Sequence, residues 1–401
     1  MKYCVWLQLV LGTASDFASK LYSKGFTAKQ IYENKNILSA ISKTLLKKAE
    51  SVSLSYALEI IEDCNKLGVK IITIEEKDYP KSLLGLLNPP IVLYYKGTFP
   101  KFNEIPSICI VGPRKISDYG YKCSYSLSAR LALAGFIIVS GGAVGCDYAA
   151  HDGALVHEGK TVAILGNGFG ADYLKQNETL RNRIEESGCL ITEYPPNTPA
   201  TKFTFPKRNR IMAAISNGTI LIEAPRRSGA LITSGIAAEI GKDVFVIPGS
   251  PSNPQYEGSN LLLRDGAKLL VEISDVFSEY LWDYSDKIDI ERSNNTELKK
   301  PVRDNIGKEK SERTKKKAVI DIKTVEKKPE NSKNIKKDKK ILSESLSKNA
   351  NIVYNSLDKQ IFCMDDLLNC DLNAAEITSA LGELEIFGYI CGIPGGRYSL
   401  K

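Results

Sequence analysis

Short apolar runs alternate with stretches of helical periodicity through the middle of the chain, from Ile105 to about Tyr284. Each run ends in glycine or another turn residue, and the segment after it carries apolar residues at helical spacing. Buried strands that alternate with helices predict an α/β domain with a mostly parallel sheet covered on both faces, the doubly wound, Rossmann-like architecture. The predicted strands are Ile108–Val111, Phe136–Ser140, Val162–Leu165, Leu190–Glu193, Thr219–Glu223, Val244–Ile247 and Leu269–Glu272.

The residues before this domain show two other patterns. Apolar residues recur at helical spacing up to about Leu67, which predicts a small N-terminal helical domain over residues 1–68. Residues 69–104 contain two apolar runs separated by prolines, which predict a connecting pair of strands. We therefore assign the Rossmann-like domain to residues 105–285.

Two further regions follow the Rossmann-like domain. Residues 286–345 have few aromatic residues, little apolar periodicity and many Lys, Glu, Asn and Ser residues, so we predict a basic, disordered linker. Residues 346–401 recover a compact pattern, in which helical spacing is followed by two short strands at Tyr389–Cys391 and Arg397–Leu400. Helices followed by a two-stranded hairpin predict a winged-helix domain.

The net charge of +7 is concentrated in one segment of the chain. Residues 299–340 contain 17 Lys and Arg against 7 Asp and Glu, a net charge of +10, so the remaining residues together carry −3. Residues 350–401 contain 7 acidic and 3 basic residues, and this net charge of −4 disfavours contact with DNA phosphates. A nucleic-acid site on the folded domains must therefore be a focused cluster of cations, while the basic segment adds salt-sensitive attraction.

Composition and cysteine usage exclude several classes of protein. No stretch approaches the roughly 18 apolar residues of a membrane span, and the N-terminus lacks the features of a signal peptide, so we expect a cytoplasmic protein without membrane contact. The nine cysteines are scattered and include no Cys-x-x-Cys pair, which predicts reduced core residues rather than disulfides or zinc ligands. His151 and His157 are the only histidines, and their spacing does not suit a shared metal ion.

Glycine-rich or basic turns follow three of the predicted strands. The first strand ends in Gly112-Pro113-Arg114, the second in Ser140-Gly141-Gly142, and the fifth leads into the turn Arg226–Gly229. Glycines at strand-to-helix turns leave backbone N–H groups that converge on one point, which suits a phosphate group. Because ligands of such sheets lie beyond the carboxyl ends of the strands, we expect these turns to share one crevice.

A cationic run from Phe205 to Arg210 lies at the start of a predicted helix. Pro206 fits the first turn, where a missing N–H costs nothing, and the positive end of the helix dipole adds to the side-chain charge. We therefore predict that this corner grips phosphate. The candidate DNA-binding residues are Arg114, Ser140, Gly141, Gly142, Lys207, Arg208, Asn209, Arg210, Arg226, Ser228, Gly229 and Thr233.

Other chemistry has weaker support in the sequence. There is no Gly-x-Gly-x-x-Gly motif and no acidic residue clearly placed for a ribose, so no dinucleotide cofactor is expected. Glu193 and Glu223 end two strands, and we expect them to orient the arginines, with acid–base chemistry by paired carboxylates as the alternative. We expect His151 to make a structural hydrogen bond near the glycine turn.

Together these motifs resemble the DNA-processing protein A family, also called DprA or Smf, from Ile108 to Ala267. The resemblance implies that the N-terminal helices form a SAM-like domain. It also implies a Rossmann-like domain that binds single-stranded DNA in a basic pocket, forms a homodimer and helps to load the RecA recombinase in natural transformation, without catalytic turnover. The motifs that carry it are Ser140-Gly141-Gly142-Ala143-x-Gly145-x-Asp147-x-x-Ala150-His151, Phe205-Pro206-Lys207-Arg208-Asn209-Arg210, Ser228-Gly229-Ala230-Leu231-Ile232-Thr233, Pro248-Gly249 and the run from Gly258 to Ala267.

By matching position, Arg114 and Lys207 are implied as the principal cations of the pocket, with Asn209 and the Ser140–Gly142 turn beside them. The sequence departs from the family at Pro113, which replaces the usual Ser or Thr of a Gly-Ser/Thr-Arg motif. This replacement removes a hydroxyl donor and one backbone N–H, while the arginine that follows is kept.

Two other functions compete with DNA binding by a mediator. Related Rossmann-like enzymes of the lysine-decarboxylase-like type hydrolyse nucleotides with a Gly-Gly-x-Gly-Thr-x-x-Glu turn, whereas this chain has Ile236 three residues after Thr233. A transcription factor acting through the winged helix is disfavoured by the acidity of that region, which suits a partner-docking module better. The sequence therefore favours a single-stranded DNA-binding protein.

Overall fold

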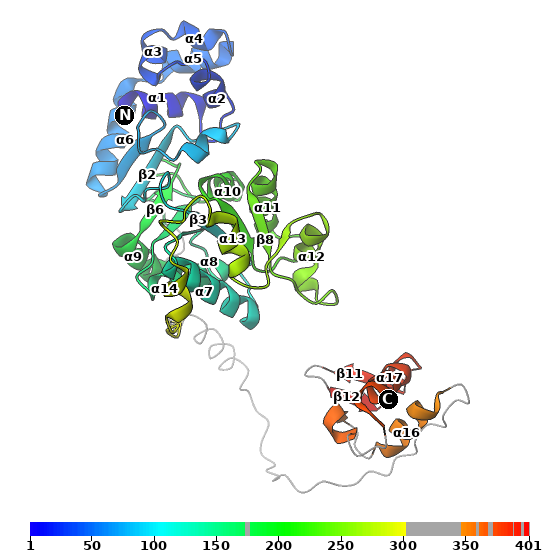
Figure 1. Cartoon of the computed structure of the whole chain (residues 1–401). Coiled ribbons are helices and arrows are strands. Elements are labelled where there is room, and N and C mark those ends of the chain that lie inside the picture. The colour runs from blue at the N-terminus through cyan, green and yellow to red at the C-terminus, as the bar shows by residue number, and fades with distance from the viewer. Residues whose placement is uncertain are drawn as a thin grey trace, which may run out of the picture. The chain divides into compact units, whose positions relative to one another are not determined.

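The computed structural model describes residues 1–172, 177–301, 346–357, 361–367, 372–387, 389–393 and 397–400. The chain forms two compact units, Met1–Ala318 and Val319–Lys401, and each is described by itself (Figure 1). Most of the predicted linker, residues 302–345, lies outside the described residues. None of the helices in the described ranges is long and apolar enough to cross a membrane.

A nine-stranded sheet forms the centre of the first unit, in the order β1-β2-β6-β5-β4-β3-β7-β8-β9. Its strands are β1 (Lys70–Thr73), β2 (Val92–Gly97), β3 (Ser107–Val111), β4 (Ile137–Ser140), β5 (Thr161–Leu165), β6 (Cys189–Thr192), β7 (Gly218–Leu221), β8 (Asp243–Val246) and β9 (Lys268–Leu269). All neighbours from β6 to β9 in this order pair in parallel, which confirms the predicted mostly parallel sheet. The chain builds outward from β3 through β4, β5 and β6, and then returns to place β7 on the other side of β3.

The two strands before β3 extend this sheet. β2 pairs antiparallel with β6, with Tyr94 opposite Thr192, and β1 pairs antiparallel with β2. We expected a connecting pair of strands here, and the structure shows instead that both belong to the main sheet. The pairing satisfies the backbone N–H and C=O groups that β6 would otherwise expose at its edge.

Helices surround this sheet. Six of them, α1 to α6, precede β1 in the sequence (Figure 1). The helices of the first unit are α1 (Lys2–Leu11), α2 (Phe17–Tyr22), α3 (Ala28–Glu33), α4 (Asn36–Ser39), α5 (Lys43–Ser51), α6 (Leu54–Lys66), α7 (Asp118–Leu133), α8 (Cys146–Leu155), α9 (Glu178–Ser187), α10 (Thr204–Ile215), α11 (Gly229–Glu239), α12 (Glu257–Arg264), α13 (Ser274–Tyr280) and α14 (Ile290–Asn295), with 3-10 turns at Lys81–Gly85 and Pro254–Tyr256.

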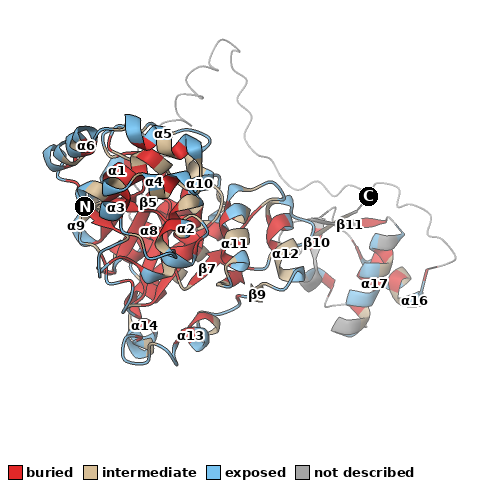
Figure 2. Cartoon of the chain, turned by 90° about the horizontal axis from the view of Figure 1, so that it is seen from above, coloured by how far each residue is buried: buried red, intermediate tan, exposed pale blue. Residues whose placement is uncertain are grey.

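Both faces of the parallel part of the sheet are buried by helices (Figure 2). On one face, apolar residues of α10 and α11 share a core with Val111, Val139 and Leu221. On the other face, residues of α7, α8 and α13 share a core with Ile110 and Ile138. Because neighbouring residues of a strand point to opposite faces, these continuous apolar strands fill both cores, as the doubly wound architecture requires.

The six N-terminal helices pack around the fully buried Trp6. Its indole Nε1 donates a hydrogen bond to the carbonyl oxygen of Val52, at 2.9 Å, so the polar end of the side chain is satisfied. Val92 and Tyr94 of β2 belong to the same apolar core. The N-terminal helices are therefore packed directly on the antiparallel edge of the sheet, and their assignment as a SAM-like domain stays a prediction.

Residues 286–301 differ from the disordered linker that we predicted. They contain α14, which packs against α7. Arg130 of α7 donates hydrogen bonds to the carbonyl oxygens of Ser293 and Thr296, and Tyr125 donates one to that of Lys299 at 2.8 Å. Polar side chains of α7 thus hold a segment whose own sequence has little apolar periodicity.

The described residues of the second unit form two helices and a small antiparallel sheet. Its strands lie in the order β10-β12-β11, and its apolar core includes Val353, Tyr354, Ile377 and Leu384. These elements have the order predicted for a winged helix, and that assignment stays a prediction. The elements are α16 (Lys348–Ser356), β10 (Ile361–Cys363), a 3-10 turn (Met364–Leu367), α17 (Ala374–Ile386), β11 (Ile390–Ile393) and β12 (Arg397–Leu400).

Candidate nucleic-acid interface

A cavity of about 400 Å³ opens beyond the carboxyl ends of the central strands. Its walls come from the turns after β3, β4 and β7 and from the first turns of α10 and α11. This is the point where the strand order reverses, since β4 and β7 flank β3 on opposite sides. Doubly wound sheets bind their ligands at such reversals, and the three turns predicted to share a crevice do so here.

The turn after β3 brings Arg114 to the cavity. Arg114 is exposed, and its guanidinium lies 5.5 Å from the centroid of the Phe205 ring, within cation–π range. The backbone of Gly145, with φ of +83°, passes so close to this turn that a Cβ atom there would lie 2.6 Å from the carbonyl oxygen of Pro113. Glycine is therefore required at this position for the turns after β3 and β4 to meet.

Helix α10 supplies the wall opposite this turn. Its first turn contains Pro206, as predicted, because the N–H groups of the first turn need no intrahelical partner. Arg208 is buried, and it donates hydrogen bonds to the carbonyl oxygens of Gly141, at 2.9 Å, and Ile164. Its Nε donates to Asn209 at 3.1 Å. Arg208 thus fixes the ends of β4 and β5 while it lines the cavity.

One acidic residue, Asp147, also lines the cavity. Burial raises the pKa of its carboxyl group, and the neighbouring Arg208 guanidinium opposes that shift. The carboxylate accepts a hydrogen bond from the backbone N–H of Ala143 at 3.2 Å. Because three arginines and one carboxylate line the cavity among the described residues, its charge favours an anion.

The turn after β7 provides the third wall. Ser228 caps α11, since its Oγ accepts a hydrogen bond from the N–H of Ala230 at 3.3 Å. Gly229 begins the helix, so the positive end of its dipole lies at the cavity. Thr233, one turn later, is buried and lines the cavity floor. Arg227 lines the cavity as its third arginine.

The structure brings half of the predicted site residues into the cavity wall. These six are Arg114, Arg208, Asn209, Ser228, Gly229 and Thr233. Sequence reasoning missed Phe205 and Arg227 as wall residues, although both belong to motifs that it identified. In the turn after β7 the two arginines are adjacent, and the sequence alone does not tell which of them faces the cavity.

The other predicted residues lie elsewhere in the structure. Gly141 and Gly142 are buried beside the cavity, and their carbonyl oxygens accept hydrogen bonds from Arg208 and Asn177. Ser140 is fully buried, and its Oγ donates to the carbonyl oxygen of Ile110 at 2.7 Å. These backbone and hydroxyl groups shape the turn after β4.

The remaining three predicted cations do not line the cavity. Arg210 is buried against Glu193, with Nη2 at 2.7 Å from both carboxylate oxygens. Arg226 is exposed and pairs with Glu257 of α12 at 3.2 Å. Lys207 is exposed and does not belong to the cavity lining. The three cations of the run on α10 therefore lie in different environments: Lys207 on the surface, Arg208 in the cavity wall and Arg210 in the core.

The expectations for the other polar residues had mixed outcomes. Glu193 orients an arginine, as predicted. For Glu223 the prediction was wrong, because its Oε1 accepts a hydrogen bond from the N–H of Ser117, at 2.8 Å, at the start of α7. His151 makes the predicted structural hydrogen bond, between Nδ1 and Oγ1 of Thr161 at 2.7 Å. Burial lowers the pKa of His151 to about 3.

Comparison with known proteins gives consistent results. Residues 70–281 match the family described as DNA recombination-mediator protein A. Protein Smf of Synechocystis sp. is 37% identical over 216 residues, which are 53% of this chain and 54% of that protein. DNA processing protein DprA of Streptococcus pneumoniae is 40% identical over 202 residues, which are 50% of this chain and 71% of that protein.

The X-ray structure of DprA from Streptococcus pneumoniae is similar to this fold. The TM-score is 0.62 at 30% sequence identity, and the likeness covers 70% of this chain and 98% of that one. The chain spans about half the length of the Synechocystis relative. The family match covers every turn that forms the cavity and confirms the resemblance drawn from the motifs. The chain belongs to the DNA-processing protein A (DprA/Smf) family.

Proposed function

We propose that this chain binds single-stranded DNA at the cavity and its rim, and acts as a mediator that protects the bound strand and helps to load the RecA recombinase in recombination and natural transformation. The observation that carries the proposal is the convergence of Arg114, Arg208 and Arg227 with the N-terminus of α11 at one cavity. The recombinase partner rests on family membership alone.

The chemistry of the cavity suits a phosphodiester backbone. Arginine is a planar, permanently charged donor that pairs with phosphate oxygens in bidentate fashion, and the N–H groups at the start of α11 add neutral donors. The partly buried ring of Phe205 lies within 6.0 Å of the guanidinium carbon of both Arg114 and Arg208. A base that stacks on this ring would place its phosphate beside the two arginines.

The exposed cation Lys207 extends the proposed site beyond the cavity. It lies on the first turns of α10, next to the wall residues Arg208 and Asn209. A strand that leaves the cavity along α10 would meet this charge. We therefore include Lys207 in the proposed site as a rim contact, whereas the buried ion pair of Arg210 keeps that residue from direct contact.

The test is a fluorescence anisotropy titration with a labelled thymidine oligonucleotide at several salt concentrations. Arg114→Ala and Lys207→Ala should each weaken binding, and each should reduce the slope of log K against log salt by about 0.7, the value for one lost phosphate contact on a single strand. Arg264→Ala is the matched control, because Arg264 is an exposed arginine that pairs with Asp265 outside the cavity.

Removing residues 302–345 should weaken binding less than either substitution, because convergent cations bind phosphate better than a solvated tail. Duplex DNA of the same length, titrated in parallel, measures the preference for single strands. Wild-type affinity in both Arg114→Ala and Lys207→Ala, with the fold intact by circular dichroism, would exclude the cavity as the DNA site.

Nucleotide hydrolysis is not favoured as the function. The turn at Ser228–Thr233 lacks the glutamate that the related hydrolases carry three residues after the threonine. Asp147, the cavity's carboxylate among the described residues, accepts a backbone hydrogen bond and lies beside Arg208. Incubation of the pure protein with nucleoside monophosphates should release no free base, and release at a steady rate would reopen the enzymatic function.

A further inference from the structure

A buried hydrogen-bond network connects the N-terminal helices to α10. Its centre is Glu193, which directly follows β6. Both carboxylate oxygens of Glu193 accept hydrogen bonds from Nη2 of Arg210, and Oε1 also accepts one from the backbone N–H of Ala14 at 3.2 Å. The side chains of the ion pair are only 3% and 6% exposed, so water contributes little to their solvation.

The backbone of Glu193 takes part in the same network. Its carbonyl oxygen accepts a hydrogen bond from Nε2 of Gln8 in α1 at 2.9 Å. Oε1 of Gln8 in turn accepts one from the hydroxyl group of Tyr94 in β2 at 2.8 Å. Residues from α1, the turn after α1 and β2 therefore all contact one strand end, and that strand end binds α10.

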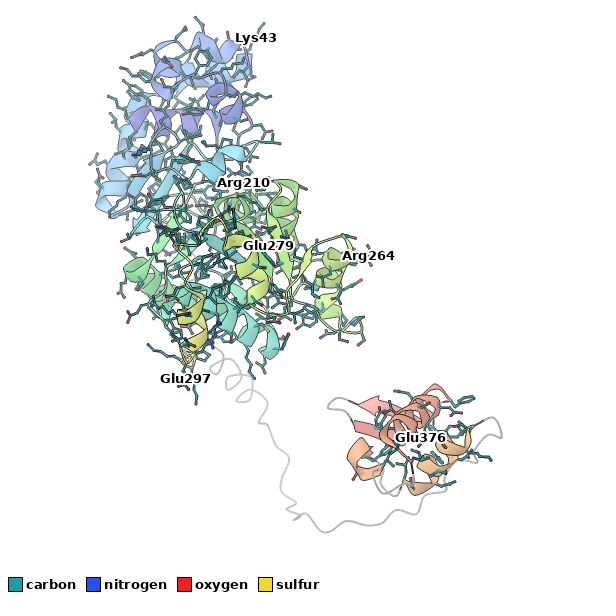
Figure 3. The ribbon with its side chains drawn as sticks, in the orientation of Figure 1. Lys43, Arg210, Arg264, Glu279, Glu297 and Glu376 are labelled. Atoms are coloured by element: carbon teal, nitrogen blue, oxygen red, sulfur yellow. The ribbon has the colours of Figure 1, made fainter. Side chains whose placement is uncertain are left out.

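The two members of this ion pair differ in how many hydrogen-bond partners they have. Glu193 has partners on both sides, whereas the structure gives Nε and Nη1 of Arg210 no hydrogen-bond partner among the described residues. The Arg210 guanidinium is thus balanced mainly by Glu193, and a buried charge left without its partner is strongly unfavourable. Figure 3 shows Arg210 where the N-terminal part of the unit meets the parallel sheet.

Arg210 shares α10 with the residues that line the cavity. Phe205, Arg208, Asn209 and Met212 all belong to this helix and to the cavity wall. Tyr194, which follows Glu193 in the sequence, also contacts this helix. Its hydroxyl group donates a hydrogen bond to the carbonyl oxygen of Thr204, in the first turn of α10, at 3.1 Å. We therefore expect a shift of Glu193 to move α10, the helix that supplies one wall of the cavity.

We propose that Glu193 and Arg210 are positioning residues that couple the seating of the N-terminal helices to the orientation of α10, and thereby set DNA affinity without touching DNA. This inference rests on the proposed single-stranded DNA site at the cavity. It assigns Arg210 a different role from Arg208, although both belong to one cationic run. It also gives the N-terminal helices an influence on DNA binding through Gln8 and Ala14.

The first test compares DNA affinity with its salt dependence in full-length variants. Glu193→Gln and Arg210→Gln should weaken binding of a thymidine oligonucleotide about two- to thirtyfold, the range of coupling through a packed network. The slope of log K against log salt should stay at the wild-type value, because no phosphate contact is lost. The matched control is Arg183→Gln, which removes another partly buried ion pair, between Arg183 of α9 and Asp152 of α8. This variant should leave DNA affinity unchanged.

Gln8→Ala tests the connection to the N-terminal helices. As a single substitution it should weaken DNA binding. In a Glu193→Gln background it should have little further effect, because both changes act through one network. Additive effects would show that the two residues act independently and would overturn the coupling. A purely structural role would lower the melting temperature of these variants without changing affinity well below that temperature, and this result would overturn the proposal too.

Hydrogen exchange on the wild-type protein tests the same coupling without any substitution. Coupling is reciprocal, so saturating oligonucleotide should slow amide exchange at Ala14 as well as in α10. Protection confined to the cavity would contradict the inference. A reduced salt slope in Arg210→Gln would show that Arg210 contacts phosphate directly. If the wild-type protein itself does not bind the oligonucleotide, the proposed function is wrong.

Discussion

Arg208 and Arg210 belong to one motif but face different parts of the molecule. Residues two apart on an α-helix lie about 200° apart around its axis, so both cannot face one cavity. Arg208 faces the ends of β4 and β5, and Arg210 faces Glu193. The sequence identified the cationic run but not its division, because the division depends on which acceptors the rest of the fold brings to each side of α10.

His151 should make stability depend on pH below neutrality. Burial lowers its pKa to about 3 in the folded state, whereas the unfolded chain has an ordinary value near 6.5. Between these values the unfolded chain binds a proton that the folded chain does not, so the free energy of unfolding falls as pH falls. From pH 6.5 to 5 the loss should be about 1.6 kcal/mol.

Urea unfolding of the wild type and of His151→Gln at pH 6.5 and pH 5 measures this contribution. The variant lacks the titrating group, so its unfolding free energy should change less over this interval. Asp147, whose pKa is raised, acts in the opposite direction and is common to both proteins. Parallel pH dependence in the two proteins would mean that His151 does not titrate as its burial requires.

At the scale of elements, the sequence located the strands well because they are buried on both faces. Six of the seven predicted strands overlap their observed counterparts over most of their length. The last differs, since β9 ends at Leu269 and the chain turns where the Asp275 carboxylate accepts hydrogen bonds from the N–H groups of Val271 and Glu272. The position of β2 beside β6 was beyond sequence patterns, because it is set by contacts between segments about 95 residues apart.

Gly145→Ala should disrupt the cavity by separating two turns. The new Cβ would collide with the carbonyl oxygens of Pro113 and Arg114, and would move Arg114 relative to α10. Overpacking of this kind costs about 1–3 kcal/mol in addition to the strain of a positive φ. We expect weaker DNA binding together with a lower free energy of unfolding.

Gly241→Ala is the control for that substitution. Gly241 has a similar φ of +71°, but a Cβ there would meet no atom within 4 Å. The control should lose only about 1–2 kcal/mol of stability from backbone strain and keep its DNA affinity. Equal effects of the two substitutions on oligonucleotide affinity would show that the contact between the turns does not position Arg114.

At the scale of the whole molecule, the two units differ in charge and, we expect, in their part in DNA binding. The helix α17 contains three glutamates and no Lys or Arg, so it offers no cation to a phosphate backbone or a base edge. Deleting residues 346–401 should change single-stranded DNA affinity by no more than a factor of about three, or about 0.6 kcal/mol. Duplex binding by the isolated residues 346–401 at physiological salt would contradict this charge argument.

We also expect the full chain to form a homodimer through the Rossmann-like domain, on the basis of family membership. Multi-angle light scattering at tens of micromolar protein measures the mass directly, against 44.2 kDa for one chain. The chain without residues 346–401 should give the same association state. A monomer that still binds DNA would show that dimerisation is not needed for the proposed function.

The pairing of β2 with β6 has a consequence for the order in which the protein is made. Synthesis proceeds from the N-terminus, yet β2 ends at Gly97 and its partner begins only at Cys189. The first hundred residues therefore leave the ribosome long before the strand end that binds Gln8 and Ala14 exists. Such non-local contacts form slowly because a long loop must close first. The apolar core that the N-terminal helices share with β1 and β2 lies almost entirely within the first hundred residues and can form early, whereas the free edge of β2 and the polar groups of Gln8 and Ala14 must wait for β6 and Glu193.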